Sequence, residues 1–146
     1  KNGAKILTDT RMAEAAISPM AKRTLNSDVQ SIFDMKSKSC DFISTTRSAV
    51  AMQTIWMDLE KQDDLRESPI VVIGSAPTAL MALLDLIEQG RKKPSLIIGM
   101  PVGFIGVSES KARLLNSDIS YIVLEGSRGG ASVAAATMNA LLKAAL

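Results

Sequence analysis

The chain has 146 residues, of which 47% are hydrophobic and 22% charged, and its formal net charge is only +2. These are ordinary values for one globular domain that buries a core, and no block of like charges indicates a nucleic-acid partner. Histidine is absent and Cys40 is the only cysteine, which excludes the common zinc ligand sets and an internal disulfide and favours a reducing, cytoplasmic location.

The first half of the chain alternates between short apolar runs and segments of helical periodicity. The predicted order is strand 4–9, helix 10–20, strand 28–34, an irregular polar stretch at 36–44, and helix 45–61. Pro19 is expected to break the first helix, because proline cannot donate the helical hydrogen bond. Thr45 or Thr46 can cap the second helix.

The second half continues the same alternation. The predicted order is strand 68–74, helix 77–90, strand 95–100, helix 108–116, strand 120–126 and helix 131–146. Pro77 at a helix start and Gly90 just past a helix end follow the usual positional preferences of these residues. Ser108 is the expected cap of the helix that it begins.

The alternation as a whole predicts the fold class. Strands that are short Val/Ile/Leu runs, each followed by a helix, favour an α/β fold. We predict a three-layer α/β/α sandwich with a mainly parallel, Rossmann-like sheet of about five strands. No internal repeat is present, so residues 1–146 are interpreted as one domain. The alanine-rich last helix is expected to pack tightly on the sheet or on a second subunit.

The apolar runs and the opening stretch bear on membranes and processing. No apolar run reaches the ~20 residues of a membrane-spanning helix, so no membrane partner is expected. The opening "KNGAKILTDT" has neither a signal-peptide core nor an initiating methionine. We therefore interpret the chain as lacking an upstream part.

Ligands of open parallel sheets bind beyond the carboxyl ends of the strands. The loops expected at that edge are 8–11, 34–39, 74–78, 99–106 and 125–130. Most of them carry glycine, hydroxyl or arginine residues, so this edge is the predicted binding site.

The loop "EGSRGG" could bind an anion. Gly126, Gly129 and Gly130 precede a helix, where free backbone amides attract negative charge, and Arg128 adds a guanidinium. The loop lacks the Gly-Lys-Ser/Thr ending of a phosphate loop, and the chain lacks the dinucleotide fingerprint. An alternative is a flexible turn with a solvated arginine.

Two other helix starts carry polar side chains. Ser75 and Thr78 offer hydroxyls, although Ser75 could simply be an N-cap. Arg47 lies in the first turn of a helix, where its charge opposes the helix dipole, which favours an anionic partner. That partner is a ligand or a nearby acid such as Asp41 or Asp9.

The loop "GMPVGFIG" at 99–106 is apolar, which is unusual for a loop that faces water. Its glycines allow a tight turn and a close approach to a ligand. Met100 and Phe104 could line a flat apolar surface, or these side chains could fold back into the core.

Together the loops offer an apolar floor, amide-rich turns and positive charges from Arg11, Arg47, Arg128 and Lys111. They offer no paired carboxylates, no metal cage and no nucleophile beside a base. This set of groups favours a large, polyanionic, partly apolar ligand, and we expect Phe104 and Arg128 to face one shared hollow.

At these residues the sequence resembles the precorrin-8X methylmutases (cobalt-precorrin-8 methylmutases) of cobalamin biosynthesis. The resemblance lies in "TTRSA" at 45–49, "APTAL" at 76–80, "GMPVGF" with "ESK" at 99–111, and "RGG", "AAA" and "NA" at 128–140. The order and the spacing of these motifs agree over essentially the whole chain.

The resemblance implies an isomerase that moves a methyl group from C11 to C12 of a corrin precursor, needs no cofactor and forms a homodimer. Arg47 and Arg128 would bind ring carboxylates, and the loop 99–104 would lie against the macrocycle. The sequence does not choose between the cobalt-free and the cobalt-bearing substrate. The residues predicted to bind substrate are Asp9, Arg11, Thr46, Arg47, Ser75, Thr78, Gly99, Met100, Pro101, Gly103, Phe104, Arg128, Gly129 and Gly130.

The resemblance also implies that the catalytic histidine lies upstream of the strand at 4–9. Without that segment we expect the fold and ligand binding, with weak or absent turnover. An alternative is a relative that lacks the histidine and only binds or carries a corrinoid. A nucleotide-binding Rossmann-like domain is a third alternative, which no fingerprint supports.

Overall fold

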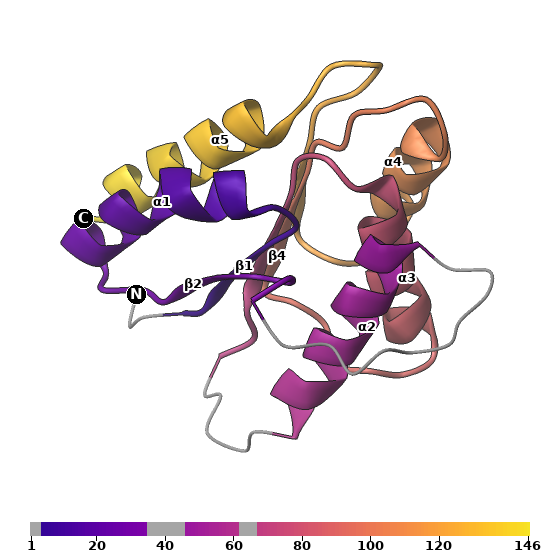
Figure 1. The fold of residues 1–146 in the computed structure, drawn as a ribbon, viewed down its shortest axis with the longest axis horizontal. Coiled ribbons are helices and arrows are strands. Elements are labelled where there is room, and N and C mark those ends of the chain that lie inside the picture. Colours follow the sequence, from indigo (N-terminus) through magenta and orange to yellow (C-terminus); the bar gives the residue numbers. More distant parts are fainter. Residues whose placement is uncertain (1–3, 35–45, 62–66) are drawn as a thin grey trace.

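The computed structural model of the chain describes residues 4–34, 46–61 and 67–146 (Figure 1). Within these ranges five strands and five helices alternate. The strands are β1 (Ile6–Thr8), β2 (Val29–Ser31), β3 (Ile70–Ile73), β4 (Leu96–Gly99) and β5 (Tyr121–Val123). The helices are α1 (Arg11–Thr24), α2 (Arg47–Glu60), α3 (Pro77–Glu88), α4 (Val107–Leu115) and α5 (Ala131–Ala144). The predicted alternation is confirmed, and the predicted irregular stretch at 36–44 lies outside the described residues.

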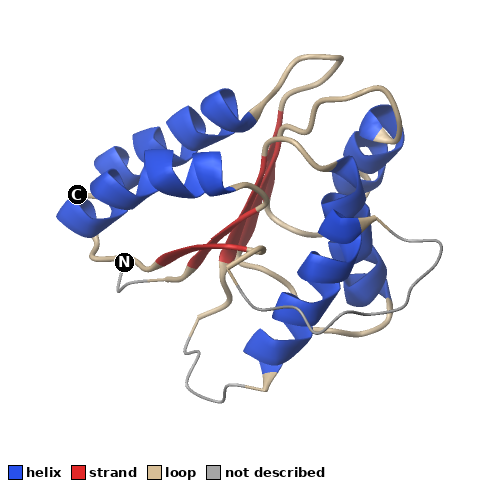
Figure 2. Cartoon of the chain, in the orientation of Figure 1, coloured by secondary structure: helices blue, strands red, loops and turns tan. Residues whose placement is uncertain are grey.

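The strands form one parallel sheet in the order β2-β1-β3-β4-β5. β1 lies between its neighbours, so that Ile6 is in register with Val29 of β2 on one side and with Ile70 of β3 on the other. Figure 2 shows this sheet nearly edge-on between two layers of helices. The predicted α/β/α sandwich with a parallel sheet of five strands is therefore confirmed.

Helices α1 and α5 lie side by side on one face of the sheet, and α2, α3 and α4 cover the other (Figure 1). Each face buries its own apolar cluster, because both faces of a parallel sheet must be covered. β3 shows this directly: Val71 belongs to the cluster under α2 and α3, while Val72 belongs to the cluster under α1 and α5, and both are fully buried. The loops at the carboxyl ends of the strands therefore rest on a rigid base.

The predicted break at Pro19 is wrong. Helix α1 continues through Pro19 to Thr24. Ile17 and Ala21 are fully buried before and after the proline, within the cluster under α1 and α5. Burial on both sides outweighs the one backbone hydrogen bond that the proline cannot donate.

Two other expected boundaries differ from the structure. Helix α4 begins at Val107 and its N-cap is Gly106, which has a left-handed backbone (φ 80°), so the predicted cap by Ser108 is wrong. The strand predicted over 28–34 ends at Ser31, because the chain then turns and the Asp34 carboxylate accepts a hydrogen bond from the Ser31 amide at 2.9 Å. Thr46 caps α2 as expected, since its hydroxyl accepts from the Ala49 amide.

Among the described helices, none combines the length and the apolar character that a membrane span requires.

Candidate functional site

The strand order reverses direction between β1 and β3. From β1 the chain crosses to β2 on one side, whereas from β3 it crosses to β4 on the other. At such a switch point the two following loops diverge and leave a crevice in which α/β proteins bind their ligands. The loops at this switch point are residues 9–11 after β1 and 74–78 after β3, so a crevice is expected between them. The predicted binding edge therefore contains the topological switch point.

Asp9 joins these two loops from inside the protein. Only 1% of the residue is exposed. Its carboxylate accepts hydrogen bonds from three successive amides, those of Gly74 at 3.0 Å and of Ser75 and Ala76 at 2.7 Å each. Burial raises the pKa of the Asp9 carboxyl above its ordinary value, and the three amides oppose that rise. Asp9 was predicted to bind substrate, and the structure instead buries its carboxylate beneath the candidate binding edge, where the three amides bind it.

This arrangement also explains the start of α3. The alternative of an N-cap by Ser75 is wrong, because the N-cap is Ala76 and no side chain of the helix start accepts a capping hydrogen bond. Pro77 takes the first helical position and has no N–H to satisfy. The hydrogen-bond acceptor for the amides at this helix start is instead the carboxylate of Asp9, in the loop after β1. The Ser75 side chain is left exposed at the edge.

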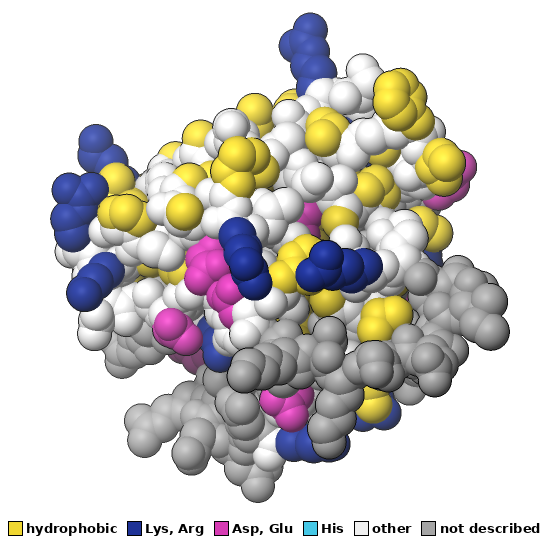
Figure 3. Space-filling view, viewed as in Figure 1, with side chains coloured by type: hydrophobic (Ala, Val, Ile, Leu, Met, Phe, Trp, Pro, Cys, Tyr) yellow, Lys and Arg dark blue, Asp and Glu magenta, His cyan; other side chains and the backbone are white. Residues whose placement is uncertain are grey.

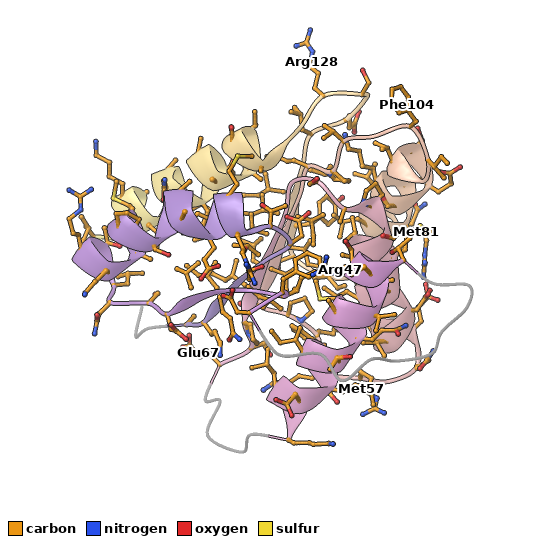
Figure 4. All side chains as sticks on the ribbon, in the orientation of Figure 1. Arg47, Met57, Glu67, Met81, Phe104 and Arg128 are labelled. Atoms are coloured by element: carbon orange, nitrogen blue, oxygen red, sulfur yellow. The ribbon has the colours of Figure 1, made fainter. Side chains whose placement is uncertain are left out.

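The starts of α2 and α3 meet beside the crevice. The Thr46 hydroxyl donates to the Thr78 hydroxyl at 2.7 Å. The guanidinium of Arg47 lies over the ring of Phe33, with its central carbon 5.1 Å from the ring centroid. Within the described residues Arg47 forms no ion pair, and Asp41, one of its two expected acidic partners, lies outside them. Asp9, the other, is engaged by backbone amides. Arg47 is therefore an exposed cation held against an aromatic face (Figure 4).

Arg11 is paired within the protein. Its guanidinium donates to the Phe33 carbonyl oxygen at 3.3 Å and lies 3.7 Å from an Asp34 carboxylate oxygen. Burial, followed by the neighbouring Asp34, raises the pKa of Glu14 on the first turn of α1. The charge of Arg11 is thus shared with acids of the same corner of the edge.

The loop after β4 divides into a buried part and an exposed tip. Gly99, Met100 and Pro101 are buried. For Met100 this agrees with the alternative that the apolar side chains of the loop fold back into the core. The tip behaves in the opposite way: Phe104 is 107% exposed and Ile105 is 85% exposed. Gly103 (φ 144°) and Gly106 (φ 80°) provide the backbone conformations that this turn needs.

The loop after β5 is fitted against the loop after β4. The Gly130 amide donates to the Met100 carbonyl oxygen at 2.9 Å. A Cβ atom added at Gly129 would lie only 2.2 Å from that same oxygen, so the two backbones touch where a side chain would not fit. The buried Lys111 donates to the carbonyl oxygens of Gly126 and Arg128 at 2.8 Å each. Lys111 is therefore a buried donor to backbone carbonyl oxygens, whereas the sequence indicated an exposed positive charge at the binding edge.

Phe104 and Arg128 do not line the same hollow. Phe104 lines an open hollow of about 480 Å³. The full lining is Gly103, Phe104, Ile105, Gly106, Val107, Ser108, Glu109, Gly126 and Ser127. Arg128 is not among these residues, and Figure 4 shows its side chain extending away from the body of the protein. The two side chains belong to neighbouring loops but face different volumes, which differs from the expectation of a shared hollow.

The candidate binding edge carries charges of both signs, because Arg47 and Arg128 are exposed there and Arg11 lies beside Asp34. In Figure 3 some Lys and Arg side chains stand singly while others are grouped at the left, and Asp and Glu side chains gather beside a central one. Over the described residues no group of three or more acidic, histidine or cysteine side chains could hold a metal ion. The arrangement can bind separate anionic groups and an apolar surface at the same time. Phe33, which supports both arginines of one corner, was missed because a single aromatic residue gives no spacing signal.

Comparison with known proteins places the chain in a family. The sequence profile of the precorrin-8X methylmutase family matches residues 1–144. The chain is 41% identical over 95% of its length to the precorrin-8X methylmutase of Pseudomonas aeruginosa, and 37% identical over 97% to the cobalt-precorrin-8 methylmutase of Synechocystis sp.. It spans 65% and 61% of the lengths of these two relatives.

Solved structures of methylmutases are also similar to this chain. The precorrin-8X methylmutase of Thermus thermophilus superimposes with a TM-score of 0.78 at 34% identity, covering 98% of this chain and 67% of that one. A precorrin-8X methylmutase related protein gives a TM-score of 0.76 at 33% identity, covering 97% and 72%. The resemblance that the motifs indicated is confirmed: this chain belongs to the precorrin-8X methylmutase family.

Proposed function

We propose that this chain forms the greater part of an isomerase of cobalamin biosynthesis. The reaction moves a methyl group from C11 to C12 of a corrin precursor, either precorrin-8X or cobalt-precorrin-8. Membership of the methylmutase family is the observation that carries the proposal. The exposed cations Arg47 and Arg128 and the exposed ring of Phe104 also support it, because they can contact a wide ligand that has carboxylates on its border.

The cations would bind the border of the ring. Arg47 and Arg128 are both exposed, and Figure 4 shows them well apart along the edge. A guanidinium binds a carboxylate through charged hydrogen bonds that contribute about 1.5–3 kcal/mol each. Two separate cations would therefore recognise a wide polyanion better than a compact one such as a phosphate.

The loops after β4 and β5 would lie against the face of the ring. Phe104 offers an apolar side chain that no other part of the described chain covers. Gly103, Gly129 and Gly130 allow the backbone to approach a planar ligand, and Ser75, Thr46 and Thr78 place hydroxyls near the crevice. Gly99, Met100 and Pro101 are buried and would support this surface from below.

Rearrangement within one molecule needs neither an oxidant nor a second substrate. The protein must hold the ring, exclude competing orientations and move a proton. We propose that the residues above bind and orient the ring, that the protein acts as a homodimer, and that it is cytoplasmic, as the single cysteine suggests.

The test is conversion of the ring substrate. Precorrin-8X mixed with the full-length protein should give the absorption spectrum of the yellow-orange corrin product, hydrogenobyrinic acid. Absence of conversion by the full-length protein would contradict the proposal.

A second candidate function is corrinoid binding without rearrangement. The specific observation in its favour is that none of the 146 residues is a histidine, the residue that most often transfers protons near neutral pH. In the same experiment, tight binding of precorrin-8X with an unchanged ring would establish this second function.

A further inference from the structure

We propose that Asp9 is a positioning residue, which fills an anion site made of backbone amides and thereby sets the geometry of the candidate binding edge. The claim that this geometry serves corrin binding rests on the proposed function. The claim that the carboxylate fills an anion site does not.

The anion site consists of the amides of Gly74, Ser75 and Ala76. They are consecutive in the chain, and all three point at one carboxylate within 2.7–3.0 Å. Successive amides before a helix form the kind of concave site that holds phosphate groups in many α/β proteins. Here the occupant is Asp9, in the loop directly after β1, 65 to 67 residues away in the chain. The protein therefore fills with its own carboxylate the position where a nucleotide phosphate would otherwise bind.

The effect of Asp9 extends beyond these amides. A Cβ atom added at Gly74 would lie 2.6 Å from the Ala131 Cα atom and 2.8 Å from its nitrogen, so the loop after β3 fits directly against the start of α5. The amide of the neighbouring Gly130 in turn donates a hydrogen bond to the Met100 carbonyl oxygen. A displacement of Gly74 must therefore move the glycine-rich turn and the loop after β4.

The same carboxylate also fixes polar groups of the crevice. Ser75 is held through its own amide, which leaves its side chain free at the surface. Thr78 follows in the first turn of α3 and accepts a hydrogen bond from the Thr46 hydroxyl. Asp9 thus positions groups on α2, α3 and α5 while contacting no ligand itself.

The test is chemical rescue of the Asp9→Ala variant with formate, a small carboxylate that can enter the space that the side chain leaves. The control variant is Asp28→Ala, whose carboxylate is 76% exposed and lies 3.8 Å from Lys5 at the opposite edge of the sheet. Each protein is measured in formate and in chloride at equal ionic strength. The two readouts are the thermal midpoint and the affinity for hydrogenobyrinic acid from an absorbance titration.

The anion-site claim predicts a selective thermal effect. Asp9→Ala should melt about 5–10 °C below the wild type. Formate should recover at least half of that loss with saturation, chloride should recover none, and the wild type and Asp28→Ala should not respond. A variant that is insoluble in chloride but folds in formate would also support the claim. Equal thermal midpoints of Asp9→Ala in formate and in chloride would overturn it. If Asp9→Ala folds in neither salt, a thermal midpoint of the isosteric Asp9→Asn equal to that of the wild type would overturn it.

The positioning claim predicts a second, parallel effect. Asp9→Ala should bind hydrogenobyrinic acid about tenfold or more weakly, and formate should restore the affinity to within about threefold of the wild type. Unchanged affinity in the variant would overturn the positioning role even if formate restores stability. If the wild type itself does not bind the corrin, the proposed function fails, while the thermal readout still decides whether Asp9 fills an anion site.

Discussion

The side-chain nitrogen of Lys111 lies 2.8 Å from the carbonyl oxygen of Arg128, and the same nitrogen binds the carbonyl oxygen of Gly126. Lys111 is only 4% exposed and forms no ion pair within the described part of the chain. A cation on α4 therefore fixes the backbone of the loop that presents Arg128.

Replacing Lys111 by methionine should loosen that loop. The change keeps most of the side-chain volume but leaves two carbonyl oxygens without their donor, which costs about 1–3 kcal/mol of unfolding free energy. Urea unfolding of Lys111→Met and of the exposed control Lys22→Met measures the difference. Equal stability of the two variants would show that the Lys111 contacts contribute nothing.

Replacing Gly129 by alanine should destabilise the protein through a backbone clash. The new Cβ atom would lie 2.2 Å from the Met100 carbonyl oxygen, and relief of that overlap costs about 3 kcal/mol. Gly126→Ala is the matched control, because Gly126 has a left-handed backbone (φ 82°) but open space around it, so only about 1–2 kcal/mol of backbone strain is expected. A larger loss in the control than in Gly129→Ala would refute the role of the contact.

Replacing Arg47 by alanine should weaken ligand binding without affecting the fold. Among the described residues the guanidinium packs on the exposed side of the Phe33 ring and forms no ion pair, so the stability should change by less than about 1 kcal/mol. Loss of a carboxylate contact should weaken hydrogenobyrinic acid binding by about 10- to 100-fold. Arg23→Ala, at the far end of α1, is the control and should bind as the wild type does. Affinity retained within twofold in Arg47→Ala would remove Arg47 from the proposed site.

The raised pKa of Asp9 predicts how stability depends on pH. Between the ordinary value of 3.8 and the higher pKa of the folded protein, the folded state holds the proton more tightly than the unfolded state does. The stability of the wild type relative to Asp9→Asn is therefore greatest below pH 3.8 and falls as the pH rises through the folded pKa. Urea unfolding of both proteins from pH 3.5 to 7 measures this difference. A difference that grows with pH would mean that the three amides outweigh burial.

The parts of the fold that local sequence dictates could be predicted. The short apolar runs at β3 and β4 need both faces covered, which is a property of the run itself. The cap at Thr46 and the proline at position 77 also act within one turn of the chain. Pro19 shows the limit, because the rule for proline is local whereas the burial of Ile17 and Ala21 that overrides it is not.

The site could be predicted at the level of loops but not of contacts. Ser75 and Thr78 lie at the predicted edge, whereas the carboxylate that holds their loop comes from Asp9, 66 residues before Ser75. Lys111 was assigned to the surface, because nothing in the sequence around it shows that two carbonyl oxygens of a later loop surround its ammonium group. Such contacts depend on the sheet order, which the pattern of strands and helices does not specify.

The central place of β1 has a consequence for how the protein is made. β1 leaves the ribosome well before one of its two neighbours, β3, which follows more than 60 residues later, since Ile6 pairs with Ile70. Until then the edge of β1 that pairs with β3 lacks that partner, and the amides of Gly74, Ser75 and Ala76 that bind the Asp9 carboxylate have not been made. The nascent chain therefore carries an unpaired edge on β1 during translation, and closure of the sheet must await synthesis of β3.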